Sequence, residues 1–204
     1  MTKIYMLAMA LTLATNLAFG AGAPQSNNQS TDAKQQAQKP ATPPPPPVGT
    51  TIEPATLYDR AVSNVEKEFV SLAEAMPADK YDFAPTTGEF KDVRKFGEQV
   101  KHVAEANMLF YGALLGQKHE EGEAKALTGK DQIVDYLKKS FELGHQAAKT
   151  MTPQNSFVTV AIGPGSSSRA GLMTLAVAHA FDHYGQMVVY GRMNGIVPPA
   201  SRQQ

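Results

Sequence analysis

The 204-residue chain contains no cysteine and no tryptophan, and aromatic residues make up only 8% of it. The lack of cysteine excludes disulfide bridges, thiolate metal ligands, a cysteine nucleophile and a lipid-modified N-terminal cysteine. Neither sign of charge is in excess, because 19 Lys and Arg stand against 19 Asp and Glu. Since nucleic-acid binders normally carry a basic excess, this balance predicts no nucleic-acid partner.

The N-terminus has the layout of a secretory signal peptide. Lys3 provides a short positive start, and the run from Ile4 to Ala18 is apolar apart from two threonines and one asparagine. At about 15 residues this run is shorter than the roughly 20 that a membrane-spanning helix needs. Ala18 and Gly20 fit the small positions of a cleavage site, so we predict a signal peptide over residues 1–20. The mature protein is then secreted or periplasmic and has no stable membrane span; an uncleaved N-terminal anchor is the alternative.

Residues 21–52 have the composition of a disordered linker. Seven of the chain's 14 prolines and five glutamines lie here, with only three charged residues. Such a segment has too little apolar surface to offset the entropy cost of folding. The run Pro43–Pro47 predicts a stiff polyproline II spacer of roughly 15 Å. We therefore predict three parts: a signal peptide, this linker and one folded domain over residues 53–204.

The predicted domain carries four stretches with the apolar period of amphipathic helices. Pro77 and Pro153 block extension of the first and third helices, and Gly116 and Gly195 are natural stops for the second and fourth. Four helices of about 20 residues each predict an all-α fold, a four-helix bundle. We expect the helices over about residues 56–76, 92–115, 128–150 and 169–193.

Several local signals indicate where these helices begin. Thr56 to Asp59 resembles a capping box, Thr128 to Asp131 is a similar start, and Ser166–Ser168 offers N-caps for the last helix. A short apolar run at Phe157–Ile162 is consistent with an extended connection, but it is too isolated to predict a sheet.

The candidate chemistry lies in the five histidines. His179 and His183 are four residues apart, so on a helix their rings share one face with Cβ atoms about 5–6 Å apart. Unpaired imidazoles on a core face are costly, and a divalent metal ion would supply the missing partner. Two hydrogen-bonded core histidines are the alternative. The same face also holds Leu172, Ala176, Gln186, Met187 and Tyr190, so we expect it to point into the bundle.

His102 lies in the middle of the second predicted helix, close to its apolar face at Val103 and Phe110. In a bundle such a position can reach the fourth helix. Three imidazoles on two facing helices form a site whose remaining positions are open to water or substrate. We therefore predict that His102, His179 and His183 are metal ligands. The carboxylates that could orient their rings are Glu98, Glu105 and Asp182, although solvated surface charges are the simpler interpretation.

Other metal motifs fail on their ligand count. The H-x-x-D-H segment ending at His183 resembles an inverted zincin motif, but no Asp or Glu follows it. The E-x-x-H segment ending at His145 fits a di-iron bundle, which needs a second such motif that the chain lacks. We therefore expect His145 to be a partly buried helix residue, and His119, in an acidic loop, to be a solvated surface residue.

Three segments of the chain resemble the DinB-like (DinB/YfiT) family. They are Phe96-Gly-Glu-Gln-Val-Lys-His102-Val-Ala, then His179-Ala-Phe-Asp-His183-Tyr-Gly-Gln186, and finally Tyr190-Gly-Arg-Met-Asn-Gly-Ile-Val-Pro-Pro199. The resemblance covers roughly residues 54–200. It implies a four-helix bundle, often dimeric, with a metal triad at His102, His179 and His183. The metal is zinc, nickel or iron in different members, and relatives include thiol-S-transferases.

Two classes of function are consistent with this pattern. One is a metal-dependent enzyme, a hydrolase or transferase acting on an unknown small-molecule substrate. The other is a non-catalytic metal-binding or interaction module of the cell envelope. A base beside an open metal position favours the enzyme, whereas a fourth protein ligand that closes the site favours the module.

Overall fold

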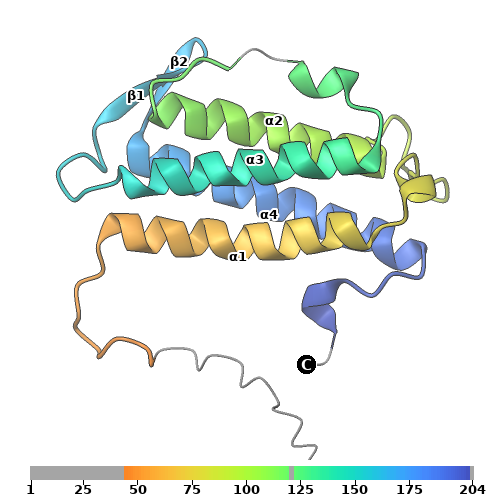
Figure 1. Ribbon diagram of the computed structural model, residues 1–204, viewed down its shortest axis with the longest axis horizontal. Helices are drawn as coiled ribbons and strands as arrows, with labels where there is room; N and C mark the ends of the chain where they lie inside the picture. Colours follow the sequence, from red (N-terminus) through yellow and green to blue (C-terminus); the bar gives the residue numbers. More distant parts are fainter. Residues whose placement is uncertain (1–43, 120–121, 203–204) are drawn as a thin grey trace, which may run out of the picture. The chain divides into compact units, whose positions relative to one another are not determined.

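The computed structural model describes residues 44–119 and 122–202 of the chain (Figure 1). The predicted signal peptide and residues 21–43 of the predicted linker lie outside the described residues. The chain divides into two units between Pro46 and Pro47, and every described helix and strand belongs to the second unit. Residues 44–52 are exposed and form neither helix nor strand, apart from a turn in which the Thr50 N–H donates to Pro47 O at 3.1 Å.

Four long helices build the second unit, as expected, and they enclose one apolar core (Figure 1). Both α1 and α2 pack against α3 and α4, so each helix has two neighbours in the bundle. None of the helices in the described part of the chain combines the length and apolar character needed to span a membrane. The elements are α1 (Pro54–Ala75), α2 (Phe96–Leu114), α3 (Lys130–Lys149) and α4 (Arg169–Met193), with short 3-10 helices η1 (Ala78–Lys80), η2 (Glu123–Ala126) and η3 (Pro199–Ser201).

The apolar period of the sequence is the cause of this packing. On α1, the residues at the predicted spacing are fully buried from Val62 to Leu72, and Met76 directly after the helix is buried as well. The opposite face carries charged side chains. The predicted all-α class and its four helices are therefore confirmed, with one small addition.

That addition is an antiparallel hairpin of β1 (Thr159–Ile162) and β2 (Gly165–Ser168). The expectation that residues 157–162 form no sheet is wrong for this segment. The partner strand is polar and short, so it has no apolar period to reveal it, and a turn at Gly163, with a φ of 53°, brings the two strands together. Val160 and Ile162 are half-buried and pack against the core, whereas Thr159 and Ala161 are exposed.

Only one of the expected helix starts is right. Ser168 caps α4, since its Oγ accepts a hydrogen bond from the Gly171 N–H at 3.0 Å. The other long helices begin elsewhere. The first begins at Pro54, whose fixed φ suits the first turn of a helix, and no side chain caps it.

The second helix begins four residues later than expected because Asp92 has a φ of 62°, which a helix cannot include. Its start is closed instead by Glu98, which accepts the Lys95 N–H at 2.9 Å. The cap of α3 is Gly129 rather than Thr128, and the Gly129 N–H donates to the side chain of Gln132 at 3.4 Å.

Candidate metal centre

Three of the five histidines meet between α2 and α4. His102 lies near the middle of α2, and His179 and His183 lie one turn apart on α4. The Nε2 atoms of His102 and His179 are 3.2 Å apart, and the three ring centroids lie 4.6–5.1 Å from one another. One nitrogen from each ring lies within 4.8 Å of the other two.

This spacing fits one metal ion. Two ligands at about 2.0–2.1 Å from a tetrahedral ion lie roughly 3.3 Å apart, close to the 3.2 Å between the Nε2 atoms of His102 and His179. The nitrogen that His183 offers lies within 4.8 Å of the other two, so the donor atoms of all three rings surround one space. Imidazole is a suitable ligand for zinc, nickel and iron, so the type of donor does not identify the metal.

The three rings are partly or fully withdrawn from solvent. His183 is buried, and the edge of His179 meets the Phe110 ring with a centroid distance of 5.8 Å and an interplanar angle of 89°. The Nδ1 atoms of His179 and His183 are buried and have no hydrogen-bond partner among the described residues. Buried polar atoms normally have a hydrogen-bond partner. Burying these two nitrogen atoms without one therefore lowers the stability of the folded protein.

Burial also keeps the three imidazoles neutral. Burial, the largest cause, lowers the pKa of His102 to about 4 together with the positive charge of Arg94 and of the two neighbouring histidines. Burial is likewise the main cause of the lowered pKa values of His179 and His183. A metal ion binds the neutral imidazole, so at pH 7 these rings are in the protonation state that ligation requires.

The three carboxylates considered as partners of these rings are engaged elsewhere. Glu98 accepts the Lys95 N–H, Glu105 accepts the Ala124 N–H at 2.9 Å, and Asp182 accepts the Gln186 amide at 3.0 Å. Among the described residues, no hydrogen bond joins any of them to the triad. Asp182 acts only through its charge, which raises the pKa of His179 and His183 against the larger effect of burial.

Two polar residues of α4 also have partners of their own. Gln186 accepts a hydrogen bond from Gln99 of α2 at 3.0 Å, and the Tyr190 hydroxyl donates to the backbone oxygen of Arg94 at 3.1 Å. These contacts join α4 to α2 and to the segment before it. They hold the two ligand-bearing helices in register, and neither residue lines the pocket beside the triad.

A pocket of about 320 Å³ opens beside the triad and is called the histidine pocket here. His102 and His179 form one side of it, and Glu105, Leu109 and His119 contribute to the remainder. The expectation that His119 is a solvated surface residue is wrong. It is half-buried because the segment after α2 folds back over that helix, and its Nε2 is buried without a partner among the described residues. No apolar period or motif in the sequence indicates that the segment after α2 folds back over the helix.

His145 does not join the triad. Its Nδ1 lies 2.7 Å from Asp59 Oδ1 and its Nε2 lies 2.9 Å from Glu66 Oε2, so it bridges α3 to α1. Burial lowers its pKa, but the hydrogen bonds to Glu66 and Asp59 outweigh burial, and the pKa lies above its usual value. His145 is thus a half-buried helix residue, as expected, with a structural ion pair that the sequence pattern did not indicate.

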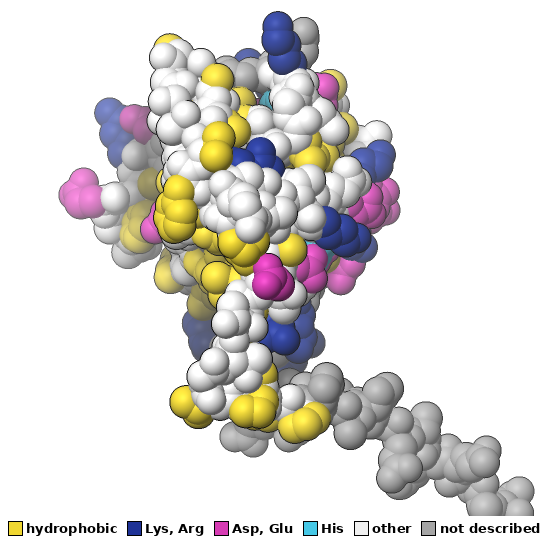
Figure 2. All heavy atoms as spheres, turned by 90° about the vertical axis from the view of Figure 1, so that its left-hand side faces the viewer, with side chains coloured by type: hydrophobic (Ala, Val, Ile, Leu, Met, Phe, Trp, Pro, Cys, Tyr) yellow, Lys and Arg dark blue, Asp and Glu magenta, His cyan; other side chains and the backbone are white. Residues whose placement is uncertain are grey.

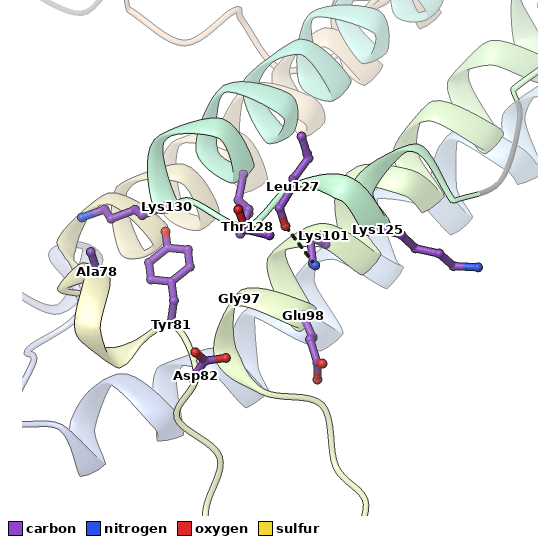
Figure 3. Close-up of a pocket in the computed structure, with 11 residues that line it drawn as sticks. Ala78, Tyr81, Asp82, Gly97, Glu98, Lys101, Lys125, Leu127, Thr128 and Lys130 are labelled. Atoms are coloured by element: carbon purple, nitrogen blue, oxygen red, sulfur yellow. Dashed lines mark hydrogen bonds between the residues drawn. The ribbon is translucent and has the colours of Figure 1, made fainter.

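A separate cavity of about 270 Å³ lies beside Tyr81, between the start of α2 and the start of α3 (Figure 3). Lys101 Nζ donates to Leu127 O at 3.2 Å, and Lys130 Nζ donates to Glu74 O and Met76 O at 2.7 and 2.8 Å. These two lysines satisfy carbonyl groups of the loop before α3 and of the end of α1, which is a structural role. We assign no site to this cavity.

Comparisons with known proteins agree with this architecture. A family model for the DinB superfamily matches residues 61–187. The fold is similar to that of a DinB-like protein from Bacillus cereus, with a TM-score of 0.59, 14% identity, and coverage of 70% of this chain and 93% of that one. A DinB-like protein from Bacillus subtilis gives a TM-score of 0.55 at 16% identity, with coverage of 72% and 99%. No curated protein matches the chain.

Proposed function

The chain belongs to the DinB superfamily, and from this membership and its three converging histidines we propose that it is an exported metalloenzyme. His102, His179 and His183 hold one divalent metal ion, which is zinc, nickel or iron. The reaction is a hydrolysis or a group transfer on a small molecule. The observation that carries the proposal is the approach of one nitrogen from each ring to within 4.8 Å of the others.

The residues present fit such an ion in three respects. The rings come from two helices that are held together by an apolar core, so their separation is fixed before the ion binds. Their lowered pKa values leave the ligating nitrogens free of protons at neutral pH. The Nε2 atoms of His102 and His179, 3.2 Å apart, have close to the separation of two nitrogens on one tetrahedral ion.

The open side of the triad favours an enzyme over a non-catalytic module. Among the described residues, no fourth His, Asp or Glu belongs to the ligand group, and the histidine pocket adjoins two of the three rings. When bound, a divalent ion supplies Lewis-acid chemistry and activates water near neutral pH. The pocket's own contributions are a space for substrate of about 320 Å³, an apolar wall at Leu109 and Phe110, and a half-buried imidazole at His119.

Elemental analysis of the purified protein tests the metal site directly. We expect close to one divalent metal ion per chain in the wild-type protein and almost none in His179→Ala. His145→Ala is the matched control, because His145 is a half-buried helix histidine outside the ligand group. Wild-type protein without stoichiometric metal would refute the proposal, and a metal-loaded protein in which a fourth protein ligand blocks the open side would favour the non-catalytic module.

Export is tested separately by N-terminal sequencing of the mature protein. The apolar run from Ile4 to Ala18 and the small residues that follow support cleavage after Gly20. We expect the mature chain to begin near Ala21 and to be recovered from the periplasm or the medium. A full-length cytoplasmic product would contradict this part of the proposal and leave the metal site unaffected.

A further inference from the structure

A second cavity continues from the histidine pocket toward the β1–β2 hairpin. It has a volume of about 560 Å³ and is called the hairpin groove here. The two cavities share two lining residues, Leu109 and His119, so they lie next to each other. Each volume lies in the range of about 300–1,000 Å³ that is usual for small-molecule sites. Figure 2 looks onto the end of the bundle that carries the hairpin, where hydrophobic side chains gather on the surface.

The hairpin groove is mainly apolar away from the triad, although Gln117 and Lys118 also line it. Its walls include Leu109 and Ala113 of α2, and Val160, Ala161 and Ile162 of β1. Leu109 is half-buried and does not belong to the side chains that pack against the core, so part of its apolar surface is available to the groove. Apolar surface left open to water gains free energy when another apolar group covers it.

Polar residues line both cavities: Glu105 lines the histidine pocket, and Gln117 and Lys118 line the hairpin groove. His119 lines both cavities, and its buried Nε2 has no hydrogen-bond partner among the described residues. His102 and His179 lie beyond it, in the histidine pocket alone. From the triad outward, a ligand therefore meets the metal-binding nitrogens first, then the imidazole of His119, and then a wall that is mainly apolar.

This order of groups is the basis of our inference about the substrate. We infer that the substrate class of this site is a small molecule with a polar, metal-binding head and an apolar tail. The head lies in the histidine pocket against the metal, the tail lies in the hairpin groove, and His119 is a positioning residue that forms a hydrogen bond with the head. The inference rests on the proposed metal function and adds to it the chemistry of the substrate.

The experiment uses n-alkyl hydroxamates, from acetohydroxamate to octanohydroxamate, as probes with a constant metal-binding head and a growing tail. Their Kd values are measured by isothermal titration calorimetry with metal-loaded wild-type protein whose metal content has been determined first. We expect Kd to fall by roughly fourfold for each added methylene, until the tail fills the groove. A protein that binds all members with the same Kd has no apolar subsite.

Two variants separate the roles of tail and head. Leu109→Gln should flatten the dependence of Kd on chain length, because it places an amide on the apolar wall. Leu175→Gln is its control, since Leu175 is an exposed leucine of α4 that lines neither cavity. His119→Ala should raise every Kd by the same factor, roughly two- to tenfold, without changing the slope. His119→Gln should restore part of the loss, because its amide can also form a hydrogen bond.

The outcomes distinguish this inference from the proposed function. A wild-type protein that holds no metal refutes both. A metal-loaded protein with a flat chain-length series, or a Leu109→Gln variant with the wild-type slope, overturns the hairpin groove as the tail site and leaves the metal site standing. Unchanged Kd values in metal-loaded His119→Ala overturn the role of His119.

Discussion

Replacing His102 with alanine removes the one metal ligand that α2 contributes. The remaining pair, His179 and His183, lies on a single helix, so an ion held by them no longer joins α2 to α4. An ion that binds only the folded bundle stabilises it by RT ln(1 + [L]/Kd), which is about 2.7 kcal/mol when the free metal is 100 times Kd. The described domain has roughly 150 residues, so this corresponds to a rise in Tm of about 5–11 °C for the wild-type protein.

In the His102→Ala variant we expect that rise almost to disappear. Losing a direct ligand should weaken binding by at least the roughly 100-fold that loss of an outer-sphere partner can cost. At the same metal concentration the ratio [L]/Kd is then near one, and the stabilisation falls to about 0.4 kcal/mol, or about 1–2 °C. The assay is differential scanning calorimetry with and without metal after treatment with a chelator.

The His119→Ala variant is the control for this measurement, because His119 lies beside the triad but outside the ligand group. It should keep the full rise in Tm and the full metal content. A His102→Ala variant that keeps both would show that the metal does not bridge the two helices, and the reasoning would be refuted even if the protein binds metal elsewhere.

The same scans repeated against pH test the protonation states of the triad. Burial holds the folded-state pKa of His102 near 4, below the usual 6.5 of the unfolded chain. A group with a lowered pKa contributes its stability above the unfolded value, and this contribution is lost as the pH falls from 6.5 towards 4. Stability of the chelated protein should therefore decline over that window. The metal-loaded protein should decline more steeply, because protons compete with the ion for the same nitrogens. A chelated protein with constant stability between pH 7 and 5 would contradict the buried, neutral state of the rings.

Three further predictions concern the scaffold. His145→Ala should cost about 1–2 kcal/mol in urea unfolding, because it removes a half-exposed ion pair with two carboxylates of α1. Because the folded-state pKa of His145 is raised, the loss of stability should be largest below pH 6.5 and should shrink as the pH rises through that pKa. A difference in unfolding free energy between wild type and variant that does not change with pH would contradict the ion pair of a protonated His145 with Asp59 and Glu66. Gly144→Ala should lower the free energy of unfolding by about 1–3 kcal/mol, because the added Cβ would lie 2.7 Å from the buried Tyr111 ring. Gly185→Ala is the control: its added Cβ has no atom within 4 Å, so the change should be neutral or stabilising by up to about 1 kcal/mol. Ser168→Ala should cost about 1 kcal/mol through loss of the α4 cap, and an unchanged urea midpoint would show that the cap is dispensable.

The sequence predicted best those features that depend on residues close together in the chain. The spacing of apolar residues is enough to predict four helices and the buried face of each, because a helix repeats every 3.6 residues whatever its neighbours are. The i, i+4 spacing of His179 and His183 places both rings on one face for the same reason. Helix starts were harder to predict, since Pro54 and Asp92 act through local backbone angles that the apolar period does not report.

The tertiary structure decided the contacts between residues that lie far apart in the chain. The packing of α2 against α4 set the 3.2 Å distance between His102 and His179, which are 77 residues apart. The return of the chain after α2 brought His119 into the histidine pocket, and the packing of α1 on α3 gave His145 its two carboxylates. A linear pattern records which residues share a helical face, but not which faces meet, because that choice depends on how the whole core packs. The sequence alone therefore determined the helices and the candidate ligands, and only the packing of the bundle determined their mutual distances and the two cavities beside them.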